Sequence, residues 1–298
     1  MPELPEVETI ARELRPLLVG RTITSVWFDW PNQIKHPAPE AFADAAVGRQ
    51  IVAVDRRGKW LVFSLSDAAV LIIQVKMTGQ LDVLVPDAPR DRHVHAVLGL
   101  DDGRELRLRD TRKFARLGLY RRDEAGKILG AEEGRELFER HGPEPLDPAF
   151  SLRDFRRRLR ARRARLKPLL MDQAFLAGVG NIYADEALWR ARLHPLRSAA
   201  SLNPDQERRL YDAIREVLRE AIERRGSSVD DYRAPNGRGE MQNFLNIYGR
   251  TGKPCPRCGR PTRRVVLNAR STHFCAWCQR LPAGQRQPAV QALLRQAR

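Results

Sequence analysis

The amino terminus carries the residues most able to do covalent chemistry. The chain opens with MPELPEVETI, and a methionine that precedes a small residue such as Pro2 is normally removed. Its removal would leave a free secondary amine. An α-amino group has a pKa near ~8, against ~10.4 for lysine, so far more of it is neutral at pH 7. A neutral secondary amine attacks an electrophilic carbon and forms an iminium ion, which is an electron sink for elimination.

Two carboxylates accompany this amine. Glu3 is its neighbour, and Glu6 follows about one helical turn later. A carboxylate beside the amine can move protons at a leaving group or at a sugar oxygen. The alternative is that Glu3 and Glu6 are ordinary charges that complement the dipole at the start of a helix. From this stretch alone both interpretations remain open.

A second group of reactive side chains lies near the other end of the chain. The sequence has four cysteines, arranged as two Cys-x2-Cys pairs with sixteen residues between them: Cys255, Cys258, Cys275 and Cys278. Four thiolates at this spacing predict one closed, tetrahedral zinc site with a structural role. Redox pairs or unused thiols are the alternative. Strand-like stretches between the pairs predict a hairpin, with Arg270 near its turn.

The elements that would position these groups change along the chain. A helix is expected from about Pro5 to Arg15, and residues 22–122 alternate as antiparallel strands of a sandwich or barrel. Residues 151–170 are helical and carry nine basic residues with one acid, which is either a solvated face or a phosphate-facing one. A further helix begins at a capping Asn203 and stops at Gly226.

Three connecting segments complete the expected architecture. The AGVGN turn at 177–181 exposes amides at a helix start, which suits a phosphate. Residues 226–246 form a long polar loop of a kind that is usually functional or disordered, and residues 281–298 are expected to fray. The expected parts are therefore a sandwich domain at 1–130, a helical domain at 131–246, a finger at 247–280 and a tail at 281–298.

The charge of the chain indicates the class of its partner. Its 298 residues include 53 Lys and Arg against 37 Asp and Glu, a formal net charge of +16. Such an excess favours a polyanion, and nucleic acid is favoured over an anionic membrane because no basic amphipathic anchor is evident. A basic surface inherited from an Arg-rich genome is the alternative. Without an apolar run of eighteen residues or a signal peptide, we expect a soluble, intracellular protein.

Several motifs occur together in one order. They are PELPEVET, RRGKWL, KMTG, DTRKF, GPEPL, LMDQAFLAGVGNIYADEAL and the four-cysteine finger. From residue 2 to about residue 280 the chain closely resembles bacterial formamidopyrimidine-DNA glycosylases of the Fpg/Nei family. The resemblance implies an α+β fold: an N-terminal β-sandwich with the catalytic proline, then a helix–two-turn–helix and a zinc finger, with double-stranded DNA between. It also implies base-excision repair by a bifunctional glycosylase/AP lyase that removes 8-oxoguanine and formamidopyrimidines and cuts by β,δ-elimination.

The same resemblance assigns roles to catalytic residues. It implies that Pro2 is the nucleophile, that Glu3 is the general acid and base, and that Glu6 supports the site by hydrogen bonding. Lys59, in the RRGK hairpin, would contact the backbone near the lesion and assist catalysis.

It also assigns DNA contacts. Met77, Arg112 and Phe114 match residues that fill the gap left by an extruded nucleotide, a role that the residues alone would not suggest. Asn181 and Arg270 match phosphate-binding positions. The resemblance also gives two further DNA contacts. His93 matches a DNA-contacting histidine, although His95 is an equally close match, and Gln74 stands where a histidine is common.

Two other functions remain open at this point. The sister branch of the family prefers oxidised pyrimidines, although the PELPEVET opening favours the purine branch. A silent damage-binding protein would use the same charge and finger, but it would have no reason to keep Pro2, Glu3 and Lys59 together. We expect a monomer with one structural zinc ion, in the bacterial cytoplasm and associated with the nucleoid rather than with a membrane.

Overall fold

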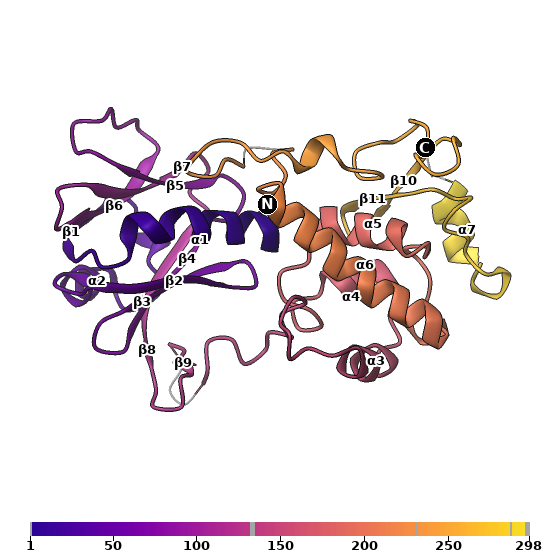
Figure 1. Ribbon diagram of the computed structural model, residues 1–298, viewed down its shortest axis with the longest axis horizontal. Helices are drawn as coiled ribbons and strands as arrows, with labels where there is room; N and C mark the ends of the chain where they lie inside the picture. Colours follow the sequence, from indigo (N-terminus) through magenta and orange to yellow (C-terminus); the bar gives the residue numbers. More distant parts are fainter. Residues whose placement is uncertain (1, 132–134, 230–231, 287, 296–298) are drawn as a thin grey trace. The chain divides into compact units, whose positions relative to one another are not determined.

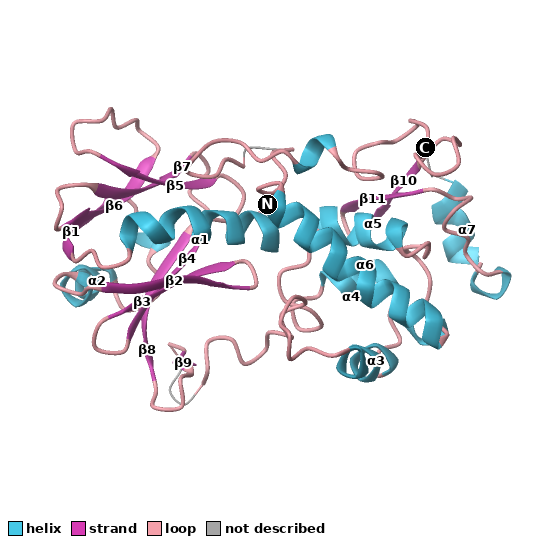
Figure 2. Ribbon diagram, viewed as in Figure 1, coloured by secondary structure: helices cyan, strands magenta, loops and turns pink. Residues whose placement is uncertain are grey.

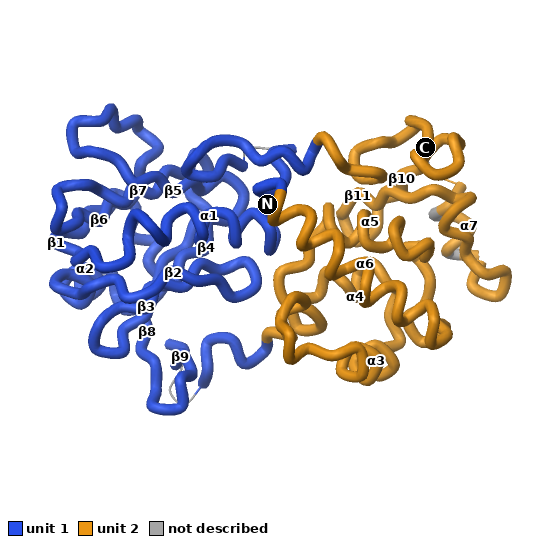
Figure 3. The backbone as a smooth tube through the Cα atoms, in the orientation of Figure 1, with its two compact units in different colours: residues 1–140, 224–242 blue, residues 141–223, 243–298 orange. Residues whose placement is uncertain are grey.

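The structure is a computed structural model that describes residues 2–131, 135–229, 232–286 and 288–295 (Figure 1). Helices and strands are unevenly distributed along the chain, with most strands before residue 130 (Figure 2). The chain divides into two compact units (Figure 3). The N-terminal unit contains residues 1–140 and 224–242, and the C-terminal unit contains residues 141–223 and 243–298.

The N-terminal unit is built on two antiparallel sheets. One sheet has the order β1 (Ile23–Phe28), β6 (Val94–Leu100), β7 (Glu105–Asp110) and β5 (Gly79–Leu84). The other has the order β2 (Ile51–Arg57), β3 (Trp60–Leu65), β4 (Ala69–Gln74), β8 (Arg116–Arg122) and β9 (Ile128–Leu129). The helices of this unit are α1 (Leu4–Leu18), η1 (Pro31–Gln33) and α2 (Pro39–Ala46). The predicted β-sandwich with an N-terminal helix is therefore confirmed.

Helix α1 is the element that carries the amino-terminal residues. Its apolar stripe, which includes Val7, Ile10 and Leu14, is buried against both sheets. The helix runs past the expected end at Arg15 and includes Pro16. A proline lacks the amide that the helix would use, but Leu14 and Leu18 are fully buried and keep the last turn packed.

The segment 224–242 folds with the sandwich and not with the helices. Tyr232 and Ala234 are buried in the same apolar cluster as α1 and the two sheets. The expected helical domain at 131–246 therefore differs from the observed C-terminal unit at both of its ends. Composition identified 226–246 as a polar loop, whereas its packing depends on two apolar residues within it.

The C-terminal unit is mainly helical. Its elements are α3 (Leu152–Arg160), α4 (Leu166–Met171), α5 (Asn181–Arg190), η2 (Ala199–Ser201), α6 (Pro204–Glu223), β10 (Arg263–Leu267), β11 (Arg270–Phe274), η4 (Ala283–Gln285) and α7 (Pro288–Arg295), and η3 (Met241–Asn243) lies at its boundary. Asn203 caps α6 as expected, since its side chain accepts from the Gln206 amide at 2.9 Å. The basic stretch 151–170 forms two short helices and not one, because an isolated bridge pairs Arg165 with Ser198.

The described part of the tail, residues 281–286 and 288–295, contains helical structure that was not expected, while residues 287 and 296–298 lie outside the described residues. Residues 288–295 form α7, and Val290 packs in a small apolar cluster with Leu196 and Leu281. A buried contact of this kind compensates the entropy of ordering a short helix. Among the described residues, no helix is both long and apolar enough to cross a membrane.

Candidate active site

The amino terminus is buried and fixed by one carboxylate. Glu3 and Glu6 are 3% and 2% exposed, and Pro2 is buried beside them. Glu6 Oε2 accepts from the Glu3 amide at 2.8 Å, and Glu6 Oε1 accepts from the Ser227 amide at 2.8 Å. Glu6 therefore serves the helix start, as the alternative interpretation held, and also joins it to the segment 224–242. Met1, whose removal would expose the Pro2 amine, lies outside the described residues.

The segment 224–242 is fitted closely to α1. Gly226 has φ +75°, and a Cβ there would lie 2.8 Å from Glu6 Oε1, so only glycine fits without a shift. The Tyr232 hydroxyl donates to the Glu6 carbonyl oxygen at 3.2 Å, and Arg225 forms an ion pair with Glu13 at 2.7 Å. Burial, with Glu6 and Glu13 nearby, raises the pKa of Tyr232 well above its usual value, so the phenol remains a donor.

Lys59 lies in the two-residue turn between β2 and β3, in the same unit as Pro2. Gly58 takes φ +57° there, and Arg57 pairs with Trp60 across the turn. Arg56, at the end of β2 beside this turn, donates to Glu8 Oε2 of α1 at 3.0 Å. Lys59 is half-buried.

Asp110 joins the loops that carry the three residues expected to fill the DNA gap. The Thr78 hydroxyl, next to Met77, donates to Asp110 Oδ1. Asp110 Oδ2 accepts from the Phe114 amide at 2.7 Å, and Oδ1 accepts from the Arg112 amide at 3.2 Å. The Arg112 guanidinium stacks 4.7 Å from the Phe114 ring centroid, and Phe114 is 41% exposed. The two loops therefore form one connected projection with an exposed aromatic residue.

The two candidate histidines differ in environment. His95 is 2% exposed, and its Nδ1 lies 2.8 Å from Asp29 Oδ1. His93 is half-buried, and its carbonyl oxygen accepts from the Asp110 amide at 2.8 Å. The position of His93 beside the Asp110 loops favours it over His95. Gln74 is half-buried at the end of β4, and its Oε1 accepts no hydrogen bond from the described residues.

A cavity of about 250 Å³ opens in the N-terminal unit beside these loops. Its lining comes from the sheet and from the segment 224–242: Thr78, Gln80, Arg109, Thr111, Tyr232, Arg233 and Arg238. Arg109 pairs with Asp91 at 2.7 Å, and Arg233 pairs with Asp82 at 2.9 Å. Three guanidinium groups and two threonine hydroxyls make this cavity rich in hydrogen-bond donors.

In the C-terminal unit, Asn181 begins α5 after the Gly-Val-Gly turn. Its Nδ2 donates to the Tyr248 hydroxyl at 3.3 Å, and its Oδ1 accepts no hydrogen bond among the described residues. Glu186, on the same helix, accepts from the backbone amides of Asn246, Ile247 and Tyr248. Burial raises the pKa of Glu186 even though these amides favour its charged form. Glu186 thus fixes the segment that carries Tyr248.

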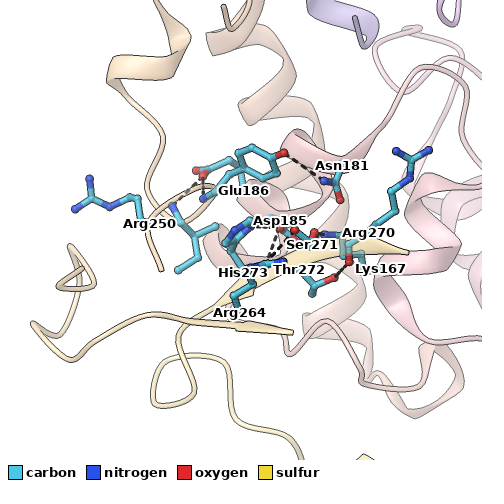
Figure 4. A network of polar contacts seen from close by, with 12 residues as sticks. Lys167, Asn181, Asp185, Glu186, Arg250, Arg264, Arg270, Ser271, Thr272 and His273 are labelled. Carbon is cyan, nitrogen blue, oxygen red and sulfur yellow. Dashed lines mark hydrogen bonds and ion pairs between the residues drawn. The ribbon is translucent and has the colours of Figure 1, made fainter. Parts of the chain in front are cut away.

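A buried polar cluster connects the helices to the hairpin that carries Arg270 (Figure 4). Lys167 Nζ lies 2.7 Å from Asp185 Oδ1 and donates to the Ser271 carbonyl oxygen at 2.7 Å. Asp185 Oδ2 accepts from the His273 amide at 2.8 Å. Lys167 and Asp185 are 1% and 0% exposed, so each charge needs the other. Arg270 is exposed at the start of β11, next to Ser271.

The four cysteines converge as their spacing predicted. Their sulfur atoms all lie within 4.8 Å of one another, and Cys258 Sγ lies 3.5 Å from Cys275 Sγ. Tetrahedral zinc with Zn–S bonds of ~2.3 Å would set the sulfurs about 3.8 Å apart, so the four thiols fit the ion. Burial alone would raise the pKa of Cys255, but the Trp189 indole and backbone amides donate to its sulfur and lower that pKa to about 7.

Three residues that hydrogen-bond near or to the candidate site residues were not predicted from the sequence. Asp110 could have been found from its place just before a polar turn, where an aspartate often accepts from amides two to four residues later. Ser227 and Tyr248 have no comparable local signal, because their partners Glu6 and Asn181 lie far away in the sequence.

Comparison with known families matches the chain in three places. Residues 1–117 match the "Formamidopyrimidine-DNA glycosylase N-terminal domain", residues 141–233 match the "Formamidopyrimidine-DNA glycosylase H2TH domain", and residues 252–281 match the "Zinc finger found in FPG and IleRS". These matches include the amino terminus, the Gly-Val-Gly turn and the four cysteines.

Curated relatives match over nearly the whole chain. The formamidopyrimidine-DNA glycosylase of Herpetosiphon aurantiacus is 50% identical over 281 residues, which cover 94% of this chain and 100% of the relative. That of Chloroflexus aurantiacus is 48% identical and covers 94% and 98%.

Solved structures agree. The MutM (Fpg) protein of Thermus thermophilus has a TM-score of 0.80 at 44% identity and covers 93% of this chain and 98% of its own. The Lactococcus lactis Fpg in complex with DNA containing an abasic site has a TM-score of 0.85 at 36% identity and covers 94% and 100%.

Proposed function

The chain belongs to the formamidopyrimidine-DNA glycosylase family, and from this premise we propose how its own residues excise an oxidised purine. The protein is a DNA-repair glycosylase with one structural zinc ion held by its four cysteines. Its partner is damaged double-stranded DNA. The observation that carries the residue assignment is the buried amino terminus, where Pro2 lies beside Glu3 and the Glu3 amide donates to Glu6.

The first step is attack by the Pro2 amine on C1′ of the damaged nucleotide. The nitrogen lone pair forms the N–C1′ bond, and the bond from C1′ to the base breaks with its electron pair leaving on the base, which takes a proton. Opening of the sugar ring then leaves an iminium ion. Glu3, the next residue after the amine, supplies the proton that the ring oxygen needs.

The iminium ion then drives strand cleavage. It acidifies the neighbouring C2′–H, so loss of that proton expels the 3′ phosphate, and a second elimination expels the 5′ phosphate. Water releases the sugar fragment and regenerates the Pro2 amine. Glu6 keeps Glu3 in place throughout, and Lys59 contributes a positive charge beside the phosphate near the lesion.

The target base must leave the stack before attack. We assign the cavity lined by Thr78, Tyr232 and Arg238 to the extruded base, because its many donors suit the carbonyl oxygens of an oxidised purine. Met77, Arg112 and Phe114 would enter the gap in the duplex. Their connection through Asp110 supports a single insertion of both loops.

Backbone phosphates are assigned to both units. Asn181 and Arg270 in the C-terminal unit, with His93 and Gln74 in the N-terminal unit, are the proposed contacts. The enzyme is inferred to act as a monomer in the bacterial cytoplasm on nucleoid DNA, because one chain supplies both the catalytic terminus and the DNA contacts.

Borohydride trapping tests the nucleophile. The substrate is a duplex with one 8-oxoguanine opposite cytosine, and the proteins are wild type, Pro2→Gly and wild type with a short extension retained before Pro2. We expect a covalent adduct at residue 2 in wild type, a slower one in Pro2→Gly, whose glycine also presents a free amine, and none at residue 2 in the extended protein. The extended protein is the matched control, since it keeps every side chain but blocks the amine.

Two results would contradict the assignment. An adduct on the extended protein would move the nucleophile elsewhere in the chain. Trapping on a thymine glycol duplex but not on 8-oxoguanine would place the substrate among the pyrimidines.

A further inference from the structure

The placement of Lys59 depends on how the hairpin tip that carries it is held. The tip is a turn of two residues, Gly58 and Lys59, between β2 and β3. A lysine side chain is long and flexible, so the placement of its ammonium group depends on how firmly the backbone beneath it is held. Chemistry at Pro2 therefore requires something that fixes this tip relative to the start of α1.

Helix α1 packs along strand β2, and the two run in opposite directions. Near the end of the helix, the Gly20 amide donates to the Ile51 carbonyl oxygen at 2.8 Å. One step nearer the amino terminus, Arg15 Nη2 donates to the Val54 carbonyl oxygen at 2.9 Å. The contacts therefore lie closer to the hairpin tip as α1 is followed back to its beginning. Figure 1 shows the hairpin tip and the beginning of α1 at the same end of these two elements.

Arg56 makes the last of these contacts and reaches the tip itself. Its Nε donates to Glu8 Oε2 on α1 at 3.0 Å, and its Nη1 donates to the Gly58 carbonyl oxygen at 3.3 Å. That carbonyl belongs to the peptide bond whose nitrogen is that of Lys59. One guanidinium group therefore bonds both the helix that begins at the catalytic terminus and the backbone that holds Lys59.

Glu8 has two arginine partners, and they differ in burial. The Arg56 side chain is 10% exposed, whereas the Arg12 side chain, which donates to Glu8 Oε1 at 2.7 Å, is 57% exposed. Solvent and salt screen the exposed pair far more than the buried one. Arg12 lies one turn further along α1 than Glu8 and so away from the amino terminus, which makes it a natural control.

We propose that Glu8 and Arg56 are positioning residues for Lys59, and that they set the placement of its ammonium group relative to the Pro2 amine. The inference rests on the proposed function, since it requires Lys59 to act at the reacting nucleotide. A displacement of about 1 Å at a reacting centre can lower a rate on the order of 100-fold, so loss of the bond to Gly58 should affect the chemical step more than binding.

Single-turnover excision of 8-oxoguanine, with the dissociation constant measured separately, tests this proposal. The variants are Glu8→Gln, Arg56→Gln and Arg56→Lys, with Arg12→Gln as the control. We expect excision to slow roughly 10- to 100-fold in Glu8→Gln and Arg56→Gln, with affinity within about threefold of wild type. Arg12→Gln should stay within about twofold. Arg56→Lys cannot donate to Glu8 and Gly58 at the same time, so its rate of excision should lie between those of Arg56→Gln and Arg12→Gln.

A double-mutant cycle shows whether the effect acts through Lys59. In a Lys59→Ala background, Arg56→Gln should cause almost no further loss, because the side chain that it positions is gone. Full loss in that background would overturn the proposal and make Arg56 merely structural. Should Arg56→Gln fail to fold, the same cycle with Arg56→Lys decides.

A failure of the positioning role can be distinguished from a failure of the proposed function. If wild type forms no borohydride adduct at Pro2, the proposed mechanism is wrong. If wild type forms the adduct and Arg56→Gln forms it at the same rate, only the positioning role is wrong.

Discussion

Gly226→Ala should damage the active site although residue 226 has no chemical group to lose. The glycine has φ +75°, and an added Cβ would lie 2.8 Å from Glu6 Oε1 and 2.9 Å from Glu6 Cγ. The Glu6 carboxylate must therefore move. It then weakens its hydrogen bonds from the Glu3 and Ser227 amides, which are 2.8 Å each.

The magnitude has two parts. Alanine in the left-handed region costs about 1–2 kcal/mol of stability wherever it occurs. Loss of a hydrogen bond to a charged group adds about 1.5–3 kcal/mol. Gly252 isolates the first part, because it has the same φ of +75° and nothing within 4 Å of an added Cβ. We expect Gly226→Ala to lower the free energy of unfolding about 1.5–3 kcal/mol more than Gly252→Ala does.

The assay is urea unfolding of both variants, followed by borohydride trapping at an abasic site. If the displaced Glu6 also frees Glu3, the same energy applied to the reaction slows trapping roughly 10- to 150-fold in Gly226→Ala. Gly252→Ala should trap at the wild-type rate. Equal stability and equal trapping in the two variants would refute the reasoning, since the clash with Glu6 would then have no consequence.

Four further results are expected. Zinc chelation should abolish DNA binding, measured by fluorescence anisotropy, while circular dichroism still reports a folded N-terminal unit; unchanged affinity after verified metal loss would contradict this. Affinity for any duplex should fall steeply with salt, with a logarithmic slope of about −0.9 for each phosphate contact, and a flat response would mean that the net charge of +16 does not bind DNA. Tyr232→Phe removes a hydroxyl from the lining of the cavity assigned to the base, so 8-oxoguanine excision should slow several-fold while cleavage at a pre-formed abasic site, which needs no base recognition, stays near wild type. Burial would raise the pKa of Glu8, but Arg12 and Arg56 outweigh it and hold that pKa below its usual value. The charged Glu8 carboxylate therefore stabilises the fold above about pH 4.3, and this stabilisation is lost as the pH falls through the lowered pKa of the folded state. The difference in the free energy of unfolding between wild type and Glu8→Gln should accordingly shrink on acidification.

Local signals in the sequence predicted the parts of the fold that depend on local chemistry. The zinc centre follows from the spacing of the four cysteines, because two short Cys-x2-Cys turns can present four sulfurs to one ion. The start of α6 follows from Asn203 and Pro204 for the same reason. The two-sheet sandwich follows from alternating apolar residues and hairpin turns.

Long-range contacts account for what the sequence did not predict. Residues 226–246 read as a polar loop of the helical part, but Tyr232 and Ala234 within them are buried in the sandwich core. Helix α7 reads as a loose tail, but Val290 packs with Leu196 and Leu281, which lie outside the helix. The residue roles assigned by resemblance, among them Lys59 and His93, remain predictions that the proposed experiments address.

The discontinuous N-terminal unit has a consequence for synthesis of the protein. Tyr232 and Ala234 complete its core and Ser227 completes the hydrogen bonds of Glu6, yet all three follow the end of the sandwich at residue 140 by some ninety residues. At roughly 5–20 residues per second, a ribosome needs about 5–20 s to add that length. During this interval the emerging chain has its amino-terminal proline but not the segment that closes the active site. We therefore expect the nascent enzyme to be inactive toward DNA until most of the polypeptide has been made, which protects the chromosome from cleavage by unfinished copies.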